Sequence, residues 1–457
     1  MPIAAVPAYL QRSDFKAASP GLRFGLLLPI WTDRADQEAQ VQERAHKRSP
    51  EGQEINSLLA RAGMDAAIAH LTQRQRLPSQ WEKNDFAARH AWSEIQPLTP
   101  GDLALQRALA ERQAGLAAAL GGTLHLRIDA QSIAPFTTGL GNEHPLENGF
   151  AFLNPYGLPY LPGSGVKGVI RQAARELASG DWADTGGWST APRHEIRIQQ
   201  GKQEIILQLS DLDVLFGLQS KDGDKQHFRG VLSFWDLIPS LSGNALMVEI
   251  MTPHQTHYYQ HGESPHESGQ PNPISFLTVP PGSRFTFHVT CDPTRLPMLL
   301  AQDSQWQHLL RAAFEHAFTW LGFGAKTAVG YGAMARDAAT EARAEQARAE
   351  QQAAKQQAAE AQAREQARQA ALAQLSPVER SIQEFLDTRA DPNQAEISAV
   401  IAAVKQGHWS DEDKPAVADW LKQRMQASKG WREQSAKKNP NKDKEYQNTL
   451  LVKQWLG

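Results

Sequence analysis

The sequence predicts an α+β fold, and three observations lead to this prediction. Segments in which apolar and polar residues alternate, as in half-buried strands, recur between residues 123 and 335. Two segments with the apolar spacing of a helix, 165–178 and 305–321, lie among them. Residues 1–121 and 337–375 have helical patterns, so the mixed region is flanked by helical parts.

Residues 1–121 are expected to form a mostly helical N-terminal elaboration. Segments 37–77 and 103–120 have helix-like apolar spacing, and four prolines interrupt the region: Pro50, Pro78, Pro97 and Pro100. Gly121 and Gly122 then end the helical pattern. The alternation over 123–129 predicts the first strand.

Residues 122–336 are expected to form the central domain. Its first helix, 165–178, has one apolar face made of Val166, Val169, Ile170, Ala173 and Leu177. Residues 157–162 are turn-rich and extended, and further strands are expected at 204–209, 230–236, 245–251, 274–279, 284–291 and 331–335. Two helices among antiparallel-looking strands favour a ferredoxin-like arrangement.

Two more regions follow the central domain. Residues 337–375 are rich in Ala, Gln, Glu and Arg without an apolar seam, which predicts a solvated helical linker. Residues 376–457 contain enough apolar side chains for a small helical domain. Its segment 429–444 has six basic and two acidic residues; it is either a solvated tail or a strip that faces RNA or a partner.

Composition excludes several classes of protein. The chain has 457 residues, 41% of them hydrophobic, a formal net charge of -3 and one cysteine, Cys291. One cysteine excludes an internal disulfide and a cysteine-based metal site, which fits a cytoplasmic protein. No segment has the signal-peptide or membrane-helix pattern. Residues 122–336 have 15 Lys and Arg against 19 Asp and Glu, so any nucleic acid must meet a local patch.

The most informative segment is the glycine-rich loop 322–332, with glycine at positions 322, 324, 330 and 332. Glycines spaced in this way let main-chain N–H groups approach a phosphate, and Lys326 and Thr327 add a cation and a hydroxyl. Tyr331 lies in the same loop. Ala325 breaks the spacing of a Walker A loop, and the preceding helical pattern excludes a dinucleotide-binding turn. A tight helix-to-strand turn with a bulge remains an alternative.

A second candidate anion site precedes the helix 165–178. The run Gly163-Ser164-Gly165 could direct N–H groups and the helix dipole toward a phosphate. Lys167 and Arg171 are four residues apart and therefore lie on one face of the helix. A solvent-exposed helix start is the alternative for these residues.

Three segments together, 137–150, 158–171 and 322–332, resemble the RAMP superfamily of CRISPR effector systems, within it the sixth-subunit family of the Cmr (type III-B) complex. Segments 215–217, 229–236 and 247–283 extend this resemblance. It implies a modified, RRM-like RNA-recognition fold. It also implies a non-catalytic structural subunit that holds crRNA and target RNA beside the fourth-type backbone subunit and the first-type subunit. No cofactor, metal, membrane or small-molecule substrate is implied.

Two groups of histidines are the remaining candidates for chemistry. His254, His257, His261 and His266 cluster with Tyr258 and Tyr259, which favours an RNA or subunit contact over a zinc site. His144 lies in a turn near Glu143 and Glu147. As a general base it would make the chain a metal-independent crRNA-processing endoribonuclease, which is the alternative function. The scattered Asp129, Asp211, Asp213 and Asp236 give no basis for a two-metal site.

Overall fold

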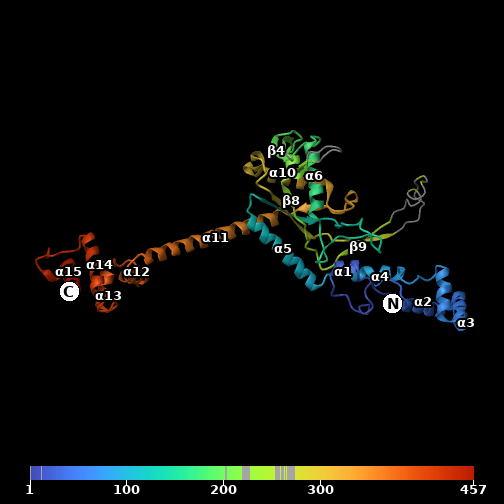
Figure 1. Cartoon of the computed structure of the whole chain (residues 1–457), viewed down its shortest axis with the longest axis horizontal. Helices are drawn as coiled ribbons and strands as arrows, with labels where there is room; N and C mark the ends of the chain where they lie inside the picture. The colour runs from blue at the N-terminus through green and yellow to red at the C-terminus, as the bar shows by residue number, and fades with distance from the viewer. Residues whose placement is uncertain are drawn as a thin grey trace. The chain divides into compact units, whose positions relative to one another are not determined.

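The computed structural model describes residues 2–457 except 12, 201–202, 219–226, 253–257, 259–261, 263 and 265–272. The chain divides into two compact units, Met1–Glu345 and Gln346–Gly457 (Figure 1). The mixed helix-and-sheet architecture predicted from the sequence is confirmed in the first unit. No helix among the described residues is long and apolar enough to cross a membrane.

Five helices form the N-terminal part: α1 (Pro20–Gly25), α2 (Arg34–His46), α3 (Pro50–Gln73), α4 (Asp85–Ile95) and α5 (Pro100–Leu120). Each begins after a side chain that accepts a hydrogen bond from a first-turn amide: Ser19, Asp33, Ser49, Asn84 and Thr99. Pro50 and Pro100 start helices, where a missing N–H costs nothing. The predicted segment 37–77 is therefore two helices, α2 and α3.

The core of the first unit is a four-stranded antiparallel sheet with the order β12-β1-β11-β8. Its strands are β1 (His125–Ser132), β8 (Leu232–Phe234), β11 (Arg284–Cys291) and β12 (Met334–Arg336). Helix α6 (Gly163–Ala178) connects β1 toward β8, and α10 (Gln305–His316) connects β11 toward β12. The chain order is thus strand, helix, two strands, helix, strand.

One face of this sheet is apolar and packs against the two helices. Ile128 of β1 pairs with Phe287 of β11, and both side chains are buried. The Phe287 ring meets Phe314 of α10 edge-on at 5.2 Å. The buried α6 residues Val166 and Ile170 belong to the same core, as the helical spacing predicts.

The opposite face of the sheet is polar. Asp129 accepts hydrogen bonds from Arg127 Nε at 2.7 Å and from Thr286 Oγ1 at 2.7 Å. His125 Nε2 and His288 Nδ1 lie 2.9 Å apart within the same face. Helix α5 crosses this side, where Gln113 donates to the Asp236 carbonyl at 2.7 Å. A cavity remains between α5 and the sheet, lined by Arg127, Asp129, Arg284 and Thr286 among others.

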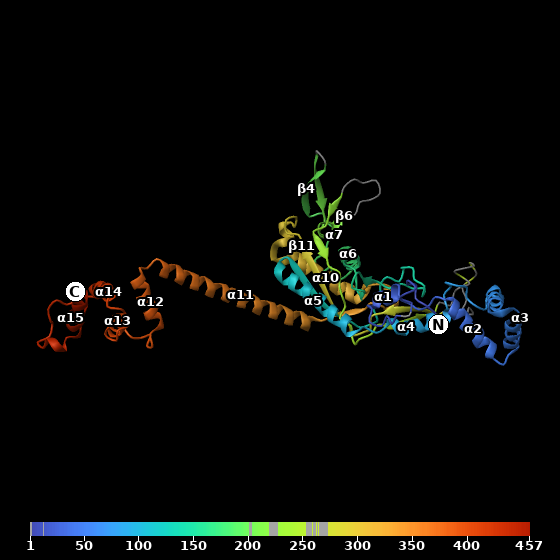
Figure 2. The ribbon, with the colours of Figure 1, turned by 60° about the horizontal axis from the view of Figure 1, so that its bottom comes forward.

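The other strands of this unit form hairpins outside the four-stranded sheet, and short helices accompany them. The hairpins pair β2 (Phe152–Leu153) with β3 (Leu158–Pro159), β4 (His194–Gln200) with β5 (Gln203–Leu209), β6 (Gly217–Leu218) with β7 (Phe228–Arg229), and β9 (Met247–Met251) with β10 (Ile274–Thr278). The short helices are α7 (Asp211–Phe216) and α9 (Met298–Ala301). Figure 2 shows the β4 hairpin standing out from the rest of its unit.

Several predicted elements differ in detail from the observed ones. The expected strand 230–236 is reduced to Leu232–Phe234. After Phe234 the chain no longer pairs continuously with β11, and it returns to this strand only in an isolated bridge between Ser240 and Arg284. The expected helix 305–321 is helical to its predicted end, but only Gln305–His316 is α-helix, and Ala317–Leu321 is a π-helix. The sequence pattern shows apolar spacing but not this change of hydrogen-bond register.

A single helix, α11 (Ala338–Ala373), follows β12, and its side chains are mostly exposed. Its first turn is tied to the sheet by the buried Glu341, which accepts hydrogen bonds from the Asp129 amide and from Arg336 and Arg311. The second unit contains α12 (Pro377–Thr388), α13 (Glu396–Lys405), α14 (Lys414–Ala427) and α15 (Lys444–Leu456). These four helices share their own apolar core around Val400, Val417, Leu421 and Val452.

The histidine pair in the sheet predicts acid sensitivity. Burial, then His125 and Arg127, lower the pKa of His288 to about 3. His288 therefore stays neutral in the folded state at pH values where the unfolded chain binds a proton, below about 6.5. We expect the free energy of unfolding to decrease as the pH is lowered below about 6.5, by up to about 1.4 kcal/mol per pH unit.

Urea denaturation at pH 7, 6 and 5 measures this dependence. The His288→Gln variant should have a shallower pH dependence than the wild type, although the half-buried His144, whose pKa is also lowered, keeps some of it. Identical slopes for the two proteins would contradict this assignment.

Candidate nucleic-acid interface

The glycine-rich loop 322–332 closes on itself and on the neighbouring chain. Phe323 N–H donates to the Gly332 carbonyl at 3.0 Å, and Gly332 N–H donates to the Pro135 carbonyl at 2.8 Å. The amides of Gly322, Gly330 and Tyr331 also donate to main-chain carbonyls within this region. Most of the amides expected to face a phosphate therefore have partners inside the protein.

Two of the four loop glycines are required by close packing. A Cβ at Gly332 would lie 1.8 Å from the Phe323 carbonyl oxygen, and one at Gly324 would lie 2.2 Å from the Thr137 carbonyl oxygen. Both residues also have positive φ, as does Gly330, whose Cβ position is open. The helix-to-strand turn, which the sequence left as an alternative, thus accounts for Gly324 and Gly332.

The side chains of this loop rest on the β9–β10 hairpin. Lys326 has a left-handed backbone with φ 59°, and its Nζ lies 5.4 Å from the centre of the Phe276 ring and 2.7 Å from Met251 Sδ. The Tyr331 hydroxyl lies 3.5 Å from a Glu249 carboxylate oxygen. Burial and this carboxylate raise the pKa of Tyr331. Thr327 follows Lys326 and is half-buried.

The start of α6 differs from the sequence expectation. The helix begins at Gly163, so the Gly163-Ser164-Gly165 run is its first turn and does not precede it. The Gly163 amide donates to Asp236 Oδ1 at 2.7 Å, so a carboxylate already lies at this helix N-terminus. A Cβ at Gly163 would come within 2.2 Å of the Phe234 carbonyl oxygen. Ser164 and Gly165 are exposed.

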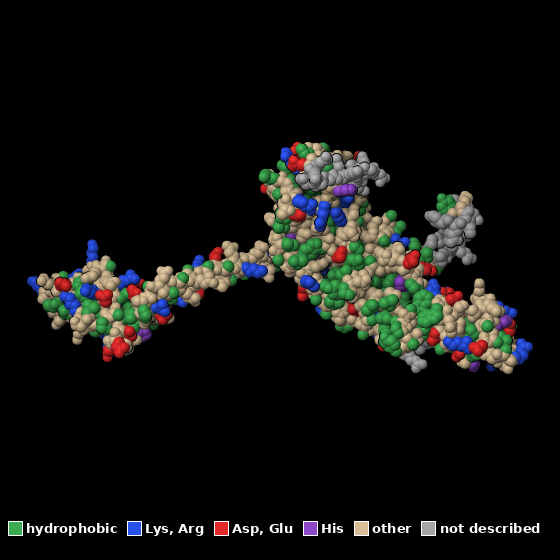
Figure 3. All heavy atoms as spheres, in the orientation of Figure 1, with side chains coloured by type: hydrophobic (Ala, Val, Ile, Leu, Met, Phe, Trp, Pro, Cys, Tyr) green, Lys and Arg blue, Asp and Glu red, His purple; other side chains and the backbone are tan. Residues whose placement is uncertain are grey.

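A group of cations lies along the outer side of α6. We name Lys167, Arg171, Arg175 and Arg229 the α6 cation cluster. The first three recur every four residues and so share one helix face, and Arg229 comes from β7. Figure 3 shows Lys and Arg side chains gathered over α6.

These cations act on one another. Burial, then the charges of Arg171 and Arg229, lower the pKa of Lys167. Burial and the charge of Arg175 lower the pKa of Arg171, and Asp213 partly opposes this. The Arg171 Nη2 donates to the Gly217 carbonyl at 2.9 Å, whereas its buried Nε has no hydrogen-bond partner among the described residues. Like charges held together in this way favour an anionic ligand.

Two members of the cluster were missed from the sequence. Arg175 continues the four-residue spacing of Lys167 and Arg171, and that signal was available. Arg229 lies 54 residues beyond Arg175, and only the fold brings it to this helix.

His144 is engaged through both ring nitrogens. Its Nδ1 accepts from the Leu146 amide at 3.1 Å, so its Nε2 carries the proton and donates to the Phe24 carbonyl at 2.8 Å. The ring stacks on Phe24 with 3.7 Å between centroids. Burial lowers the pKa of His144. This geometry is that of a structural histidine and argues against a general base.

The histidine-rich segment is largely outside the described residues. His254, His257, Tyr259, His261 and His266 fall there, and Tyr258 is 45% exposed. Within the described part of the chain, no group of three or more His, Cys, Asp or Glu side chains could hold a metal ion.

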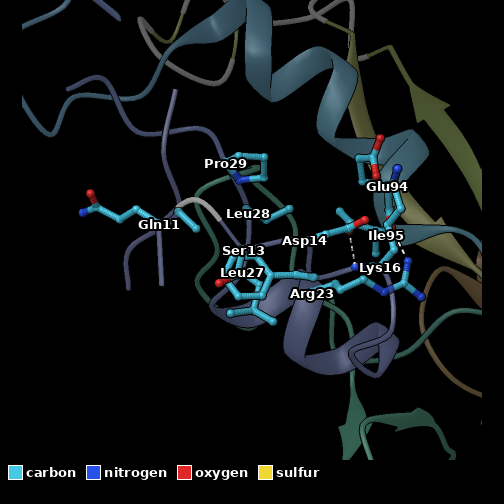
Figure 4. Close-up of a pocket in the computed structure, with 12 residues that line it drawn as sticks. Gln11, Ser13, Asp14, Lys16, Arg23, Leu27, Leu28, Pro29, Glu94 and Ile95 are labelled. Carbon is cyan, nitrogen blue, oxygen red and sulfur yellow. Dashed lines mark hydrogen bonds between the residues drawn. The ribbon is translucent and has the colours of Figure 1, made fainter. Parts of the chain in front are cut away.

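A further cavity lies among the N-terminal helices and is lined by Lys16, Arg23, Leu28 and Glu94 among others (Figure 4). The Arg23 guanidinium is buried and donates to the main-chain carbonyls of Ala18, Glu94 and Pro97. It therefore ties α1 to the end of α4, and it is not available to a phosphate.

Known proteins are similar to the central domain. The model of the RAMP superfamily matches residues 129–335, which include the sheet, α6, α10 and the glycine-rich loop. The match spans somewhat less than half of the chain, and we call residues 129–335 the RAMP segment because this model matches them. A curated relative, the CRISPR system Cmr subunit Cmr6 of Pyrococcus furiosus, is 29% identical over 235 residues. That match covers 43% of this chain and 63% of the relative, somewhat less than two thirds of its length.

Two solved structures are also similar. The crystal structure of Cmr6 from Pyrococcus furiosus has 25% sequence identity, covers 47% of this chain and 98% of its own, and gives a TM-score of 0.24. The cryo-EM structure of the type III-B Cmr-beta complex bound to cognate target RNA includes a chain with 14% identity. It covers 66% of this chain and 89% of its own, with a TM-score of 0.34.

The packing of the glycine-rich loop predicts a difference between two of its glycines. Gly332→Ala places a methyl group against the Phe323 carbonyl and should cost about 3 kcal/mol or more in the free energy of unfolding. Gly330→Ala has the same type of backbone strain but open space, so it should cost only about 1 kcal/mol. Urea denaturation of both variants measures the difference. Equal losses would show that the close contact is not a constraint.

Proposed function

We propose that this chain is a non-catalytic, RNA-binding structural subunit of a type III-B Cmr CRISPR effector complex. In this role it holds crRNA and target RNA and contacts the fourth-type backbone subunit and the first-type subunit. Its similarity to Cmr6 and the RAMP segment at 129–335 support the proposal.

We also infer that the sheet and its two helices form a ferredoxin-like unit. The chain order β1-α6-β8-β11-α10-β12 and the sheet order β12-β1-β11-β8 support this inference. In such a unit the RNA-recognition fold is modified, because α5 crosses the polar face of the sheet. RNA bases are therefore not expected to stack on that face.

The observation that carries the proposal is the α6 cation cluster. The domain is mildly acidic as a whole, and yet four cations lie together on α6 and β7. Burial, and after it the neighbouring cations, lower the pKa values of Lys167 and Arg171. A phosphodiester strand supplies evenly spaced negative charges to such a row. Phosphate contacts bind RNA of any sequence, which a subunit that holds variable guide RNAs requires.

We assign two roles within the glycine-rich loop. Gly322, Gly324 and Gly332 shape the turn, because each has positive φ and the last two pack against main-chain carbonyls. Lys326, Thr327, Gly330 and Tyr331 form the side that contacts RNA. The ammonium group of Lys326 is held over Phe276, which fixes its position before a phosphate arrives.

The cation cluster leads to a test of RNA binding. The double variant Lys167→Ala/Arg229→Ala should bind crRNA about tenfold more weakly and reduce the slope of log affinity against log salt by about 1–2. Target RNA cleavage per assembled complex should stay at the wild-type rate. Filter binding across a salt series and cleavage assays on purified complexes measure both.

The matched control is Arg107→Ala/Arg112→Ala, which removes two exposed cations of α5. It should leave affinity and salt slope unchanged. Wild-type RNA affinity in the α6 double variant, or complete loss of cleavage by fully assembled complexes, would contradict the proposal.

The alternative role of His144 has a separate test. The purified chain is incubated with a CRISPR repeat RNA in EDTA, and the products are separated on a denaturing gel. Because both ring nitrogens of His144 are engaged, we expect no specific cuts. Cuts that disappear in His144→Ala would make the chain a crRNA-processing endoribonuclease.

A further inference from the structure

The second unit has an uneven charge distribution. Residues 422–453 contain nine Lys and Arg against three Asp and Glu, whereas residues 379–419 contain four against nine. The basic part comprises the C-terminal end of α14, the segment after it and most of α15. Figure 3 shows blue side chains in the region that Figure 1 labels α14 and α15, and a red group next to α13.

The segment between α14 and α15 is an ordered loop and not a loose tail. Asp443 is only 2% exposed, and its carboxylate accepts from the Ala436 amide at 2.9 Å and the Ser435 hydroxyl at 3.2 Å. It also caps α15 by accepting from the Tyr446 amide. Near the start of the loop, the Arg432 amide donates to Thr449 Oγ1 of α15 at 3.1 Å.

This order places several lysines at the surface. We name Lys438, Lys442 and Lys444 the loop lysines; all three are exposed. Lys437 Nζ donates to the Lys442 carbonyl at 3.1 Å and draws the two arms of the loop together. The acidic side chains in and next to the loop form ion pairs with other cations. Asp443 and Glu445 pair with Arg432, and Glu433 pairs with Lys453. In this fully described unit, no ion pair within 4.0 Å involves a loop lysine.

Tryptophans lie among these cations. Lys453 Nζ is 5.8 Å from the centre of the half-buried Trp431 ring, and the Arg424 guanidinium is 5.3 Å from that of Trp420. Aromatic rings among exposed cations suit single-stranded nucleic acid, whose bases stack while its phosphates pair with lysine. An acidic peptide would use the cations but has no need of the rings.

We propose that the lysine-rich loop 429–444 and the adjoining α14–α15 surface form a second RNA-binding site, which takes the phosphodiester backbone of a single strand. This site is separate from the RAMP segment and does not depend on the function proposed for it. Its contacts are sequence-independent, because the cations face phosphates.

The test uses the full-length chain and a fluorescein-labelled single-stranded RNA of about 30 nucleotides, with affinity measured by anisotropy over a salt series. The triple variant Lys438→Glu/Lys442→Glu/Lys444→Glu should bind at least tenfold more weakly. Its slope of log affinity against log salt should be shallower by about 2, since each lost phosphate contact on a single strand contributes about 0.7. Circular dichroism should give an unchanged helix content, because all three side chains are exposed.

The control is Lys355→Glu/Arg364→Glu/Lys405→Glu, which makes the same change in net charge at exposed positions outside the loop. Its affinity should stay within about twofold of the wild type. Equal effects of the two triple variants, or none from the loop variant, would overturn the proposal. Displacement of the RNA by polyglutamate as efficiently as by unlabelled RNA would also overturn it, in favour of an acidic protein partner.

The two RNA sites can be told apart in the same assay. Combining the loop variant with Lys167→Ala/Arg229→Ala should weaken binding further than either set of substitutions alone, because each set removes the phosphate contacts of one site. Weakening by the α6 substitutions alone would remove the second site and leave the proposed function intact. Weakening by the loop substitutions alone would overturn RNA binding by the α6 cation cluster and leave the second site intact.

Discussion

The packing of Phe287 is the interaction on which the RAMP segment depends. Its ring lies in the middle of the sheet and contacts Phe314, Phe318 and Phe323, with centroid distances of 5.2, 5.9 and 5.0 Å. These three rings come from α10, the π-helix Ala317–Leu321 and the glycine-rich loop. One buried aromatic group thus joins the sheet, its helix and the loop, so the loop is positioned by the core. The glycines then let the backbone follow the path that Phe323 imposes.

Clusters of cations on the surface are the second main feature of the structure. The buried face of α6 holds the helix on the sheet, and its opposite face carries cations that repel one another. A folded protein keeps such repulsion only where the rest of the structure outweighs it, and an anion relieves it. The second unit repeats this arrangement in another form, since Asp443 orders a loop in which the three loop lysines have no acidic partner within 4.0 Å among the described residues. In both places the cations lie on an ordered scaffold.

Much of this architecture could be predicted, because apolar periodicity and proline positions are local signals. The strand at 284–291 and the helix after Pro162 follow from alternation and helical spacing. The sequence could not show that Asp236 lies at the α6 N-terminus, or that the loop amides bond to Thr137 and Pro135. These partners are distant in sequence and meet only after folding. For the same reason Arg229 was missed, and the short motifs seemed more open to a phosphate than they are.

The central claim is that the α6 cation cluster holds a sugar-phosphate strand and performs no chemistry on it. A density map of the RNA-bound effector complex that contains this chain tests it most directly. The account predicts phosphate oxygens within hydrogen-bonding distance of at least two of Lys167, Arg171 and Arg229, in the absence of any break in the strand there. A map in which another protein subunit covers these three side chains, with no nucleotide beside them, would contradict it.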